Sequence, residues 1–254
     1  MKKLYIPVVL LLLLILPSCV DIEEQYDFKS DGACNVRYGF DMSKAVSVLM
    51  NLMTDSVRET PQFAMVKDTT LNFYNALPDS ISRKMNAEET RMAQGSDLSI
   101  NMDLKRNVMK VSIRHEAKDA ADLQYYLQHL SSISMNSQLN NVASNNSQVK
   151  NFDAQPLISG QSYYNYQITP HKFARVIDKD KFNNFLKKAG NKFAMAKAML
   201  IDMPYKVILN FAKPVKKVNN PKAIVSADRR KVTIETSMDE VIKNPALMNL
   251  EVDF

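Results

Sequence analysis

Residues 20–41, VDIEEQYDFKSDGACNVRYGFD, set the fold of this chain. Apolar side chains occupy every second position from Cys34 to Phe40, and polar or small residues stand between them. This alternation is typical of a strand with one buried face. Residues 20–28 alternate less regularly, and Asp31-Gly32 between the two runs is a turn signal. The stretch therefore predicts a β-hairpin.

Downstream of the hairpin, two periodicities divide the chain. Apolar residues at helical spacing predict helices over 43–58, 119–135 and 178–200, one or two short helices within 71–92, and a weak helix over 238–247. Alternation predicts strands over 98–104, 109–113, 163–168, 205–211, 232–236 and 248–254. Strands dominate both ends, so we expect an α+β fold with a mostly antiparallel sheet, built from N- and C-terminal hairpins and covered by amphipathic helices.

Upstream of the hairpin lies a secretory signal. Lys2 and Lys3 precede the apolar run 4–16, and Leu16-Pro17-Ser18-Cys19 closes it in a way that resembles a bacterial lipobox. The run is shorter than the roughly 20 residues that a membrane-spanning helix needs. We therefore expect a lipoprotein signal peptide over 1–18, lipidation of Cys19, and a single lipid-anchored α+β domain over 19–254. There are two alternatives: a retained N-terminal membrane helix, or a secreted protein in which Cys19 is an ordinary thiol.

The cysteine count limits the chemistry of the mature domain. The chain has two cysteines, so lipidation of Cys19 leaves Cys34 as its one thiol and excludes an intramolecular disulfide. Cys34 stands at the start of a predicted strand without a histidine or a cationic cluster beside it in the sequence. We expect it to be a small buried residue rather than a reactive thiol.

Positive charge is concentrated in one segment. Residues 179–231 carry fourteen basic and three acidic side chains, in a chain of net charge +6. Near a lipid anchor such a segment favours contact with anionic head groups; a solvated helix face with ordinary turn lysines is the alternative. The candidate contacts are Lys187, Lys188, Lys192, Lys216, Lys217, Arg229 and Arg230.

The chain lacks the usual sequence motifs of catalysis. Its three histidines, His115, His129 and His171, show no metal-ligand spacing, and five glycines form neither a phosphate loop nor a nucleophile elbow. We expect no catalytic residue, no metal and no cofactor. The extracytoplasmic compartment argues against nucleic acid as a partner.

Three local patterns resemble a known group of proteins. Besides the signal, these are the turn Asp31-Gly32-Ala33, the strand-to-helix passage 38–43 (YGFDMS) and the late turn 203–207 (MPYKV). They are similar to uncharacterised lipoproteins of the Bacteroidetes and, more distantly, to the LppM-type lipoprotein domain. The resemblance implies a fold and a location but no catalytic residues.

These observations predict a non-enzymatic lipoprotein of the bacterial cell envelope, with the outer membrane as the favoured site. It would bind a partner protein or an anionic membrane surface. In a second hypothesis, helices 43–58 and 178–200 enclose a cavity for a lipid or other amphiphile, which the fifteen methionines would suit. A hydrolase with an unrecognised site is the third.

Overall fold

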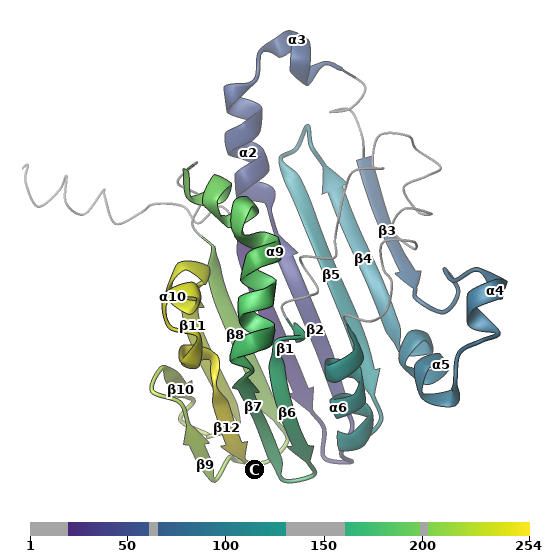
Figure 1. Ribbon diagram of the computed structural model, residues 1–254, viewed down its shortest axis with the longest axis vertical. Coiled ribbons are helices and arrows are strands. Elements are labelled where there is room, and N and C mark those ends of the chain that lie inside the picture. The colour runs from purple at the N-terminus through teal and green to yellow at the C-terminus, as the bar shows by residue number, and fades with distance from the viewer. Residues whose placement is uncertain (1–19, 61–65, 131–160, 199–202) are drawn as a thin grey trace, which may run out of the picture.

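A large sheet organises the protein. The computed structural model describes residues 20–60, 66–130, 161–198 and 203–254, with the side chains of 189–198 excepted. The eight-stranded sheet has the order β10-β11-β8-β1-β2-β5-β4-β3 (Figure 1). Its strands are β1 (Asp21–Phe28), β2 (Cys34–Asp41), β3 (Val66–Asn72), β4 (Ser96–Asp103), β5 (Val108–Ala117), β8 (Pro204–Phe211), β10 (Ala223–Val225) and β11 (Lys231–Ser237).

Two pairings of β1 place it at the centre of this sheet. It forms the predicted antiparallel hairpin with β2, in the register Ile22↔Phe40, and on its other edge it runs parallel to β8, in the register Phe28↔Phe211. The first and last thirds of the chain therefore share one sheet. We call the end of the sheet where β1 begins the proximal end, and the end where β1 finishes the distal end.

A second sheet covers part of the large one. It has the order β6-β7-β12-β9, with β6 at Tyr164–Thr169, β7 at Lys172–Ile177, β9 at Lys217–Asn219 and β12 at Leu250–Asp253. The Phe173 ring on β7 packs against Tyr26 and Phe28 on β1, with ring centroids 5.1 and 5.8 Å apart. Aromatic contacts between the two sheets thus form much of the core.

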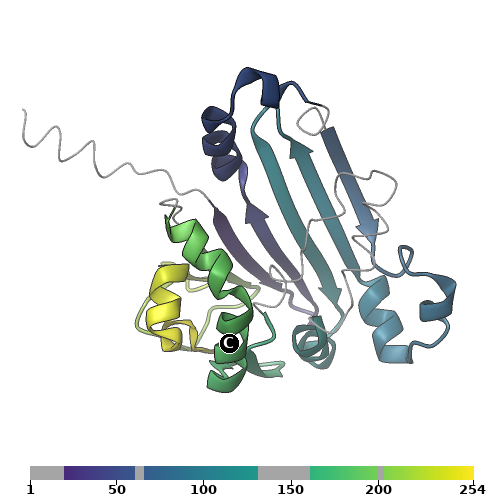
Figure 2. The ribbon, with the colours of Figure 1, turned by 45° about the horizontal axis from the view of Figure 1, so that its top comes forward.

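Two helices cover the same face of the large sheet (Figures 1 and 2). Helix α6 (Ala120–His129) stacks Tyr126 on His115 of β5 at 3.9 Å. Helix α9 (Lys179–Ala198) packs Phe182 and Phe185 against Tyr163, each with its ring centroid 5.0 Å from the tyrosine ring. All three of these aromatic side chains are buried.

The opposite face of the large sheet is polar. On β2, Val36, Tyr38 and Phe40 are buried while Arg37 is exposed, as expected for an antiparallel sheet with one wet face. Arg37 pairs with Glu23 on β1, and Lys206 Nζ lies 2.7 Å from Glu235 Oε1 across β8 and β11. The α+β fold with a large, mostly antiparallel sheet is confirmed.

The helix predicted over 43–58 is interrupted. Helix α2 (Ser43–Leu52) ends, Met53 and Thr54 are extended, and a single turn, α3 (Asp55–Arg58), follows. The Arg58 guanidinium donates to Met53 O from Nε at 3.1 Å and from Nη2 at 2.9 Å. This contact satisfies a carbonyl that the break leaves without a helical partner.

Residues 66–72 form a strand that the sequence pattern does not predict. β3 is the edge strand of the large sheet and none of its residues is buried, so it lacks the apolar alternation of a core strand. Two short helices, α4 (Asp79–Ser82) and α5 (Ala87–Gln94), follow as expected. Near the C-terminus, α10 (Met238–Lys243) and a 3-10 turn, η3 (Pro245–Met248), replace the weak helix predicted over 238–247, because Pro245 ends it.

Candidate functional site

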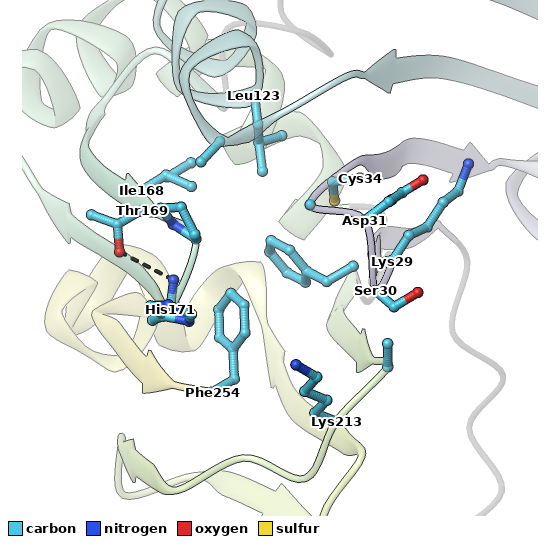
Figure 3. Close-up of a pocket in the computed structure, with 15 residues that line it drawn as sticks. Lys29, Ser30, Asp31, Cys34, Leu123, Ile168, Thr169, His171, Lys213 and Phe254 are labelled. Carbon is cyan, nitrogen blue, oxygen red and sulfur yellow. Dashed lines mark hydrogen bonds between the residues drawn. The ribbon is translucent and has the colours of Figure 1, made fainter.

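A cleft of about 230 Å³ lies at the distal end of the molecule (Figure 3). Because β1 and β8 are parallel, both finish at this end, and Ala212 N donates to Phe28 O to extend their pairing. The β1–β2 turn, the β6–β7 turn, the first turn of α6 and Phe254 meet there. Its lining is Phe28, Lys29, Ser30, Asp31, Gly32, Cys34, Ala120, Leu123, Ile168, Thr169, Pro170, His171, Ala212, Lys213 and Phe254.

The interior of the cleft is apolar and includes the rings of Phe28 and Phe254. Phe28 stacks on Phe211 with a 5.0 Å centroid distance and a 3° interplanar angle, and Phe254 lies 5.0 Å from Phe28. Leu123 from α6 and Ile168 from β6 face the same space (Figure 3). Such a surface binds apolar groups by removing them from water.

The rim is polar and carries two lysines. Across the described parts of the chain, neither Lys29 nor Lys213 makes a hydrogen bond or an ion pair through its ammonium group. Asp31 is engaged locally, since its Oδ1 accepts from Ala33 N at 3.1 Å, and Gly32 has a φ of 91°, which closes the turn. An anionic group on a ligand would therefore meet two available cations beside an apolar interior.

Cys34 forms part of the cleft wall but is shielded. It is 1% exposed, and burial raises the pKa of its thiol far above the usual value. The interpretation of Cys34 as a small buried residue agrees with this environment. Cys19 lies outside the described residues.

The predicted basic contacts fall into two groups. Lys216, Lys217, Arg229 and Arg230 gather at the distal end, where Val215 N bonds Arg229 O and Lys216 N bonds Asp253 O. Lys187 and Lys188 lie on the exposed side of α9, which runs away from that end (Figures 1 and 2). The Lys192 side chain is outside the described part of the structure.

Arg229 is held by the backbone rather than free for a ligand. Its Nε donates to Val215 O at 2.8 Å and its Nη2 donates to Lys216 O at 3.0 Å. Its φ of 56° shows that the turn needs a left-handed residue here. The guanidinium stabilises the loop that carries Lys213 and Lys216.

A second polar constellation is sealed inside the molecule. Glu24 on β1 accepts from Arg175 Nη1 at 2.5 Å, Tyr26 OH at 3.0 Å, Gln161 Nε2 at 2.7 Å and Tyr205 OH. Burial would lower the pKa of Arg175, but the attraction of Glu24 and nearby tyrosines outweighs it, so that this pKa is raised. Within the described ranges, Arg175 Nη2, Tyr163 OH and Tyr164 OH have no hydrogen-bond partner.

Ser96 and His115 form a contact that resembles a nucleophile and its base. Ser96 Oγ lies 2.9 Å from His115 Nδ1, yet both residues are 0% exposed. Ser96 Oγ uses its proton to donate to Met92 O at 2.6 Å, so the histidine nitrogen donates to the serine oxygen. Burial lowers the pKa of His115 to about 4. This pair joins α5 to the sheet and offers no access for a substrate.

Sequence reasoning did not find the cleft. Lys29, His171, Lys213 and Phe254 come from four separate segments, and none belongs to a recognisable motif. Within the described ranges, no three His, Cys, Asp or Glu residues could hold a metal ion. Nor does any described helix have the length and apolarity to cross a bilayer.

Comparison with known proteins gives no match. Neither a protein-family model, nor a curated protein, nor a solved structure is similar to this chain.

Proposed function

We propose that this protein is a non-enzymatic lipoprotein of the bacterial cell envelope that binds a partner protein at its distal cleft. The observation that carries the proposal is the position of the cleft relative to Cys19. β1 begins at Asp21, two residues after that cysteine, and finishes at Phe28, inside the cleft lining. A lipid on Cys19 and a ligand in the cleft would lie at opposite ends of one strand.

The length of β1 sets the separation. Eight residues at about 3.3 Å each span roughly 25 Å. A lipid at Cys19 would therefore hold the proximal end against the membrane and turn the cleft, with Lys216, Lys217 and Arg230, away from it. This orientation favours a partner beyond the anchoring membrane over the lipid surface itself. The outer membrane remains the favoured location.

The size of the cleft favours a side chain over a lipid. Sites for drug-sized molecules occupy roughly 300–1,000 Å³, and this cleft has about 230 Å³. That space accepts one large apolar side chain. With Lys29 and Lys213 on the rim, we expect the partner to present an aromatic or large aliphatic residue next to an acidic one.

Site-specific photocrosslinking in the native cell tests the proposal. The photoreactive p-benzoylphenylalanine replaces Ser30 on the exposed rim, and the adduct is measured by gel shift and mass spectrometry. We expect a discrete protein adduct that is lost in a Lys29→Glu, Lys213→Glu variant. The matched control reverses the same amount of charge on α9, with Lys187→Glu and Lys188→Glu, and should keep the adduct.

Each contrary outcome has a distinct meaning. A protein adduct that survives the rim reversal, or that the α9 reversal removes equally, would overturn the cleft as the partner site. An adduct of lipid mass would replace the partner hypothesis with the amphiphile hypothesis. The anchor is tested separately: mass spectrometry of the chain from native membranes should find Cys19 as its first residue with lipid attached, and an unmodified Cys19 would overturn lipidation as the tether.

A further inference from the structure

An apolar surface stands at the proximal end, where a helix normally shows polar residues. Val48, Leu49 and Leu52 on α2 and Val57 on α3 are 39%, 40%, 74% and 41% exposed. We call these four residues the apolar lobe. Figures 1 and 2 show α2 and α3 projecting beyond the large sheet at this end.

Three residues of the lobe form a second apolar face on α2, separate from the face that packs. Val46 and Met50, four residues apart, are buried, and α2 contacts β5 of the sheet. Val48 and Leu52 are also four apart, and Leu49 is three before Leu52, so they share a different face of the helix. A surface helix has one apolar stripe, which faces the core. Folding of the described chain accounts for the first face and leaves the second uncovered.

Strand pairing brings the lobe close to Cys19 in space. Asp41, at the end of β2, is paired with Asp21, at the start of β1, and α2 begins two residues after Asp41. The chain between Cys19 and Asp21 can reach at most about 7 Å. The fold therefore fixes α2 at the end of the molecule that leads to Cys19.

The surroundings of the lobe suit a membrane interface. Helix α2 contains no acidic residue, and the one acidic residue of α3, Asp55, pairs with Arg58 at 3.4 Å. Beside α2 lies the β4–β5 turn, since Met109 N donates to Ser43 Oγ at 3.1 Å. This turn carries the exposed Lys105 and Arg106, of which Arg106 also pairs with Asp103 at 3.9 Å. Apolar residues that enter the interface, with basic residues at head-group level, are the pattern of interfacial helices.

We propose that the apolar lobe inserts into the bilayer that holds the lipid on Cys19. The inference rests on the anchor in the proposed function and adds a second, non-covalent contact with the same membrane. The lobe would also fix the tilt of the domain, which a flexible lipid tether does not.

Tryptophan fluorescence tests the insertion, because the chain has no tryptophan of its own. Leu52→Trp in the full lipidated protein is reconstituted into vesicles whose acyl chains carry bromine, which quenches tryptophan on contact. The matched control is Ile224→Trp on β10, since Ile224 is 64% exposed and lies on a distant edge strand. Thermal unfolding confirms that both variants are folded.

We expect Leu52→Trp to lose about half of its emission or more, as residues in the interface contact the acyl chains. Ile224→Trp should keep its emission. Equal emission from both variants, in protein that floats with the vesicles, would overturn the insertion and leave the anchor intact. Wild-type protein that does not float would instead overturn the anchor of the proposed function and, with it, this inference.

Discussion

Arg175 Nη1 lies 2.5 Å from Glu24 Oε2, and the two side chains are 0% and 1% exposed, so a buried ion pair joins the second sheet to the central strand of the first. Removing one partner of such a pair leaves a charge without compensation in the core. Removing one partner therefore lowers the free energy of unfolding strongly, even where replacing the whole pair with apolar residues would change it little.

We expect Glu24→Gln to lower the free energy of unfolding by about 3–5 kcal/mol, because Arg175 would keep its charge in a buried site. Urea denaturation of the mature chain measures the change. Glu235→Gln is the matched control: its partner Lys206 lies 2.7 Å away, but the side chains are 41% and 59% exposed. An exposed pair contributes under about 1 kcal/mol. Equal losses in the two variants would show that the buried pair has no special role.

Stability should fall as the pH drops from about 6.5 to about 4 through His115. Burial lowers the pKa of this histidine to about 4 in the folded chain, while the unfolded chain takes up the proton near 6.5. Protons therefore favour the unfolded state across this window, by up to about 3 kcal/mol at its acid end.

The His115→Phe variant isolates this contribution. Phenylalanine keeps a ring to stack on Tyr126, and Ser96 keeps its hydrogen bond to Met92 O. Unfolding free energies measured at intervals between pH 6.5 and 4 should have a smaller slope than in the wild type. A wild-type slope in His115→Phe would contradict the prediction.

Cys34 should resist alkylation in the native protein. Burial excludes reagents and raises the pKa of the thiol, so the reactive thiolate is scarce. With iodoacetamide at pH 8, we expect modification roughly 100-fold slower than in urea, where the thiol has its ordinary pKa. Mass spectrometry of the mature chain follows the reaction. Fast labelling without denaturant would mean that the cleft wall opens readily.

Gly32→Ala should destabilise the protein by about 1 kcal/mol through the backbone alone, because its φ of 91° disfavours any residue with a Cβ. A Cβ at this position would meet no atom within 4 Å, so no clash contributes. Gly39→Ala is the control at an ordinary φ, where the nearest heavy atom to the new Cβ is 3.7 Å away. Thermal melts of both variants compare the two effects, and an unchanged melting temperature for Gly32→Ala would contradict the strain.

Strands with one buried face were predictable, because every second side chain of such a strand faces the core and is apolar. The alternation from Cys34 to Phe40 shows this most clearly. β3 was not predicted, because neither face of this edge strand is buried and its sequence therefore lacks the alternation. β7 was not predicted for the opposite reason. Its centre is buried but contains Arg175, a residue type that normally indicates the surface.

The features that the sequence did not predict depend on contacts between distant segments of the chain. Residues 179–231 are rich in positive charge, but in the fold Lys187 lies on α9, whereas Lys216 lies at the distal end beside Asp253. The cleft likewise exists only once β1, β6, β8 and the chain end meet. No local motif predicts the cleft or the distribution of the basic residues, since each segment supplies only a few of the residues involved.

The parallel pairing of β1 with β8 also constrains how the chain reaches its native state. Asp27 and Asn210 are bonded side by side although 183 residues separate them. A chain made from its N-terminus therefore completes β1 and β2 long before the neighbour of β1 exists. Until β8 is made, the edge of β1 that pairs with it has no partner. Pairings between segments so far apart in the sequence are also slow to form. Truncation before β8 should consequently yield a chain that fails to fold rather than a shorter domain.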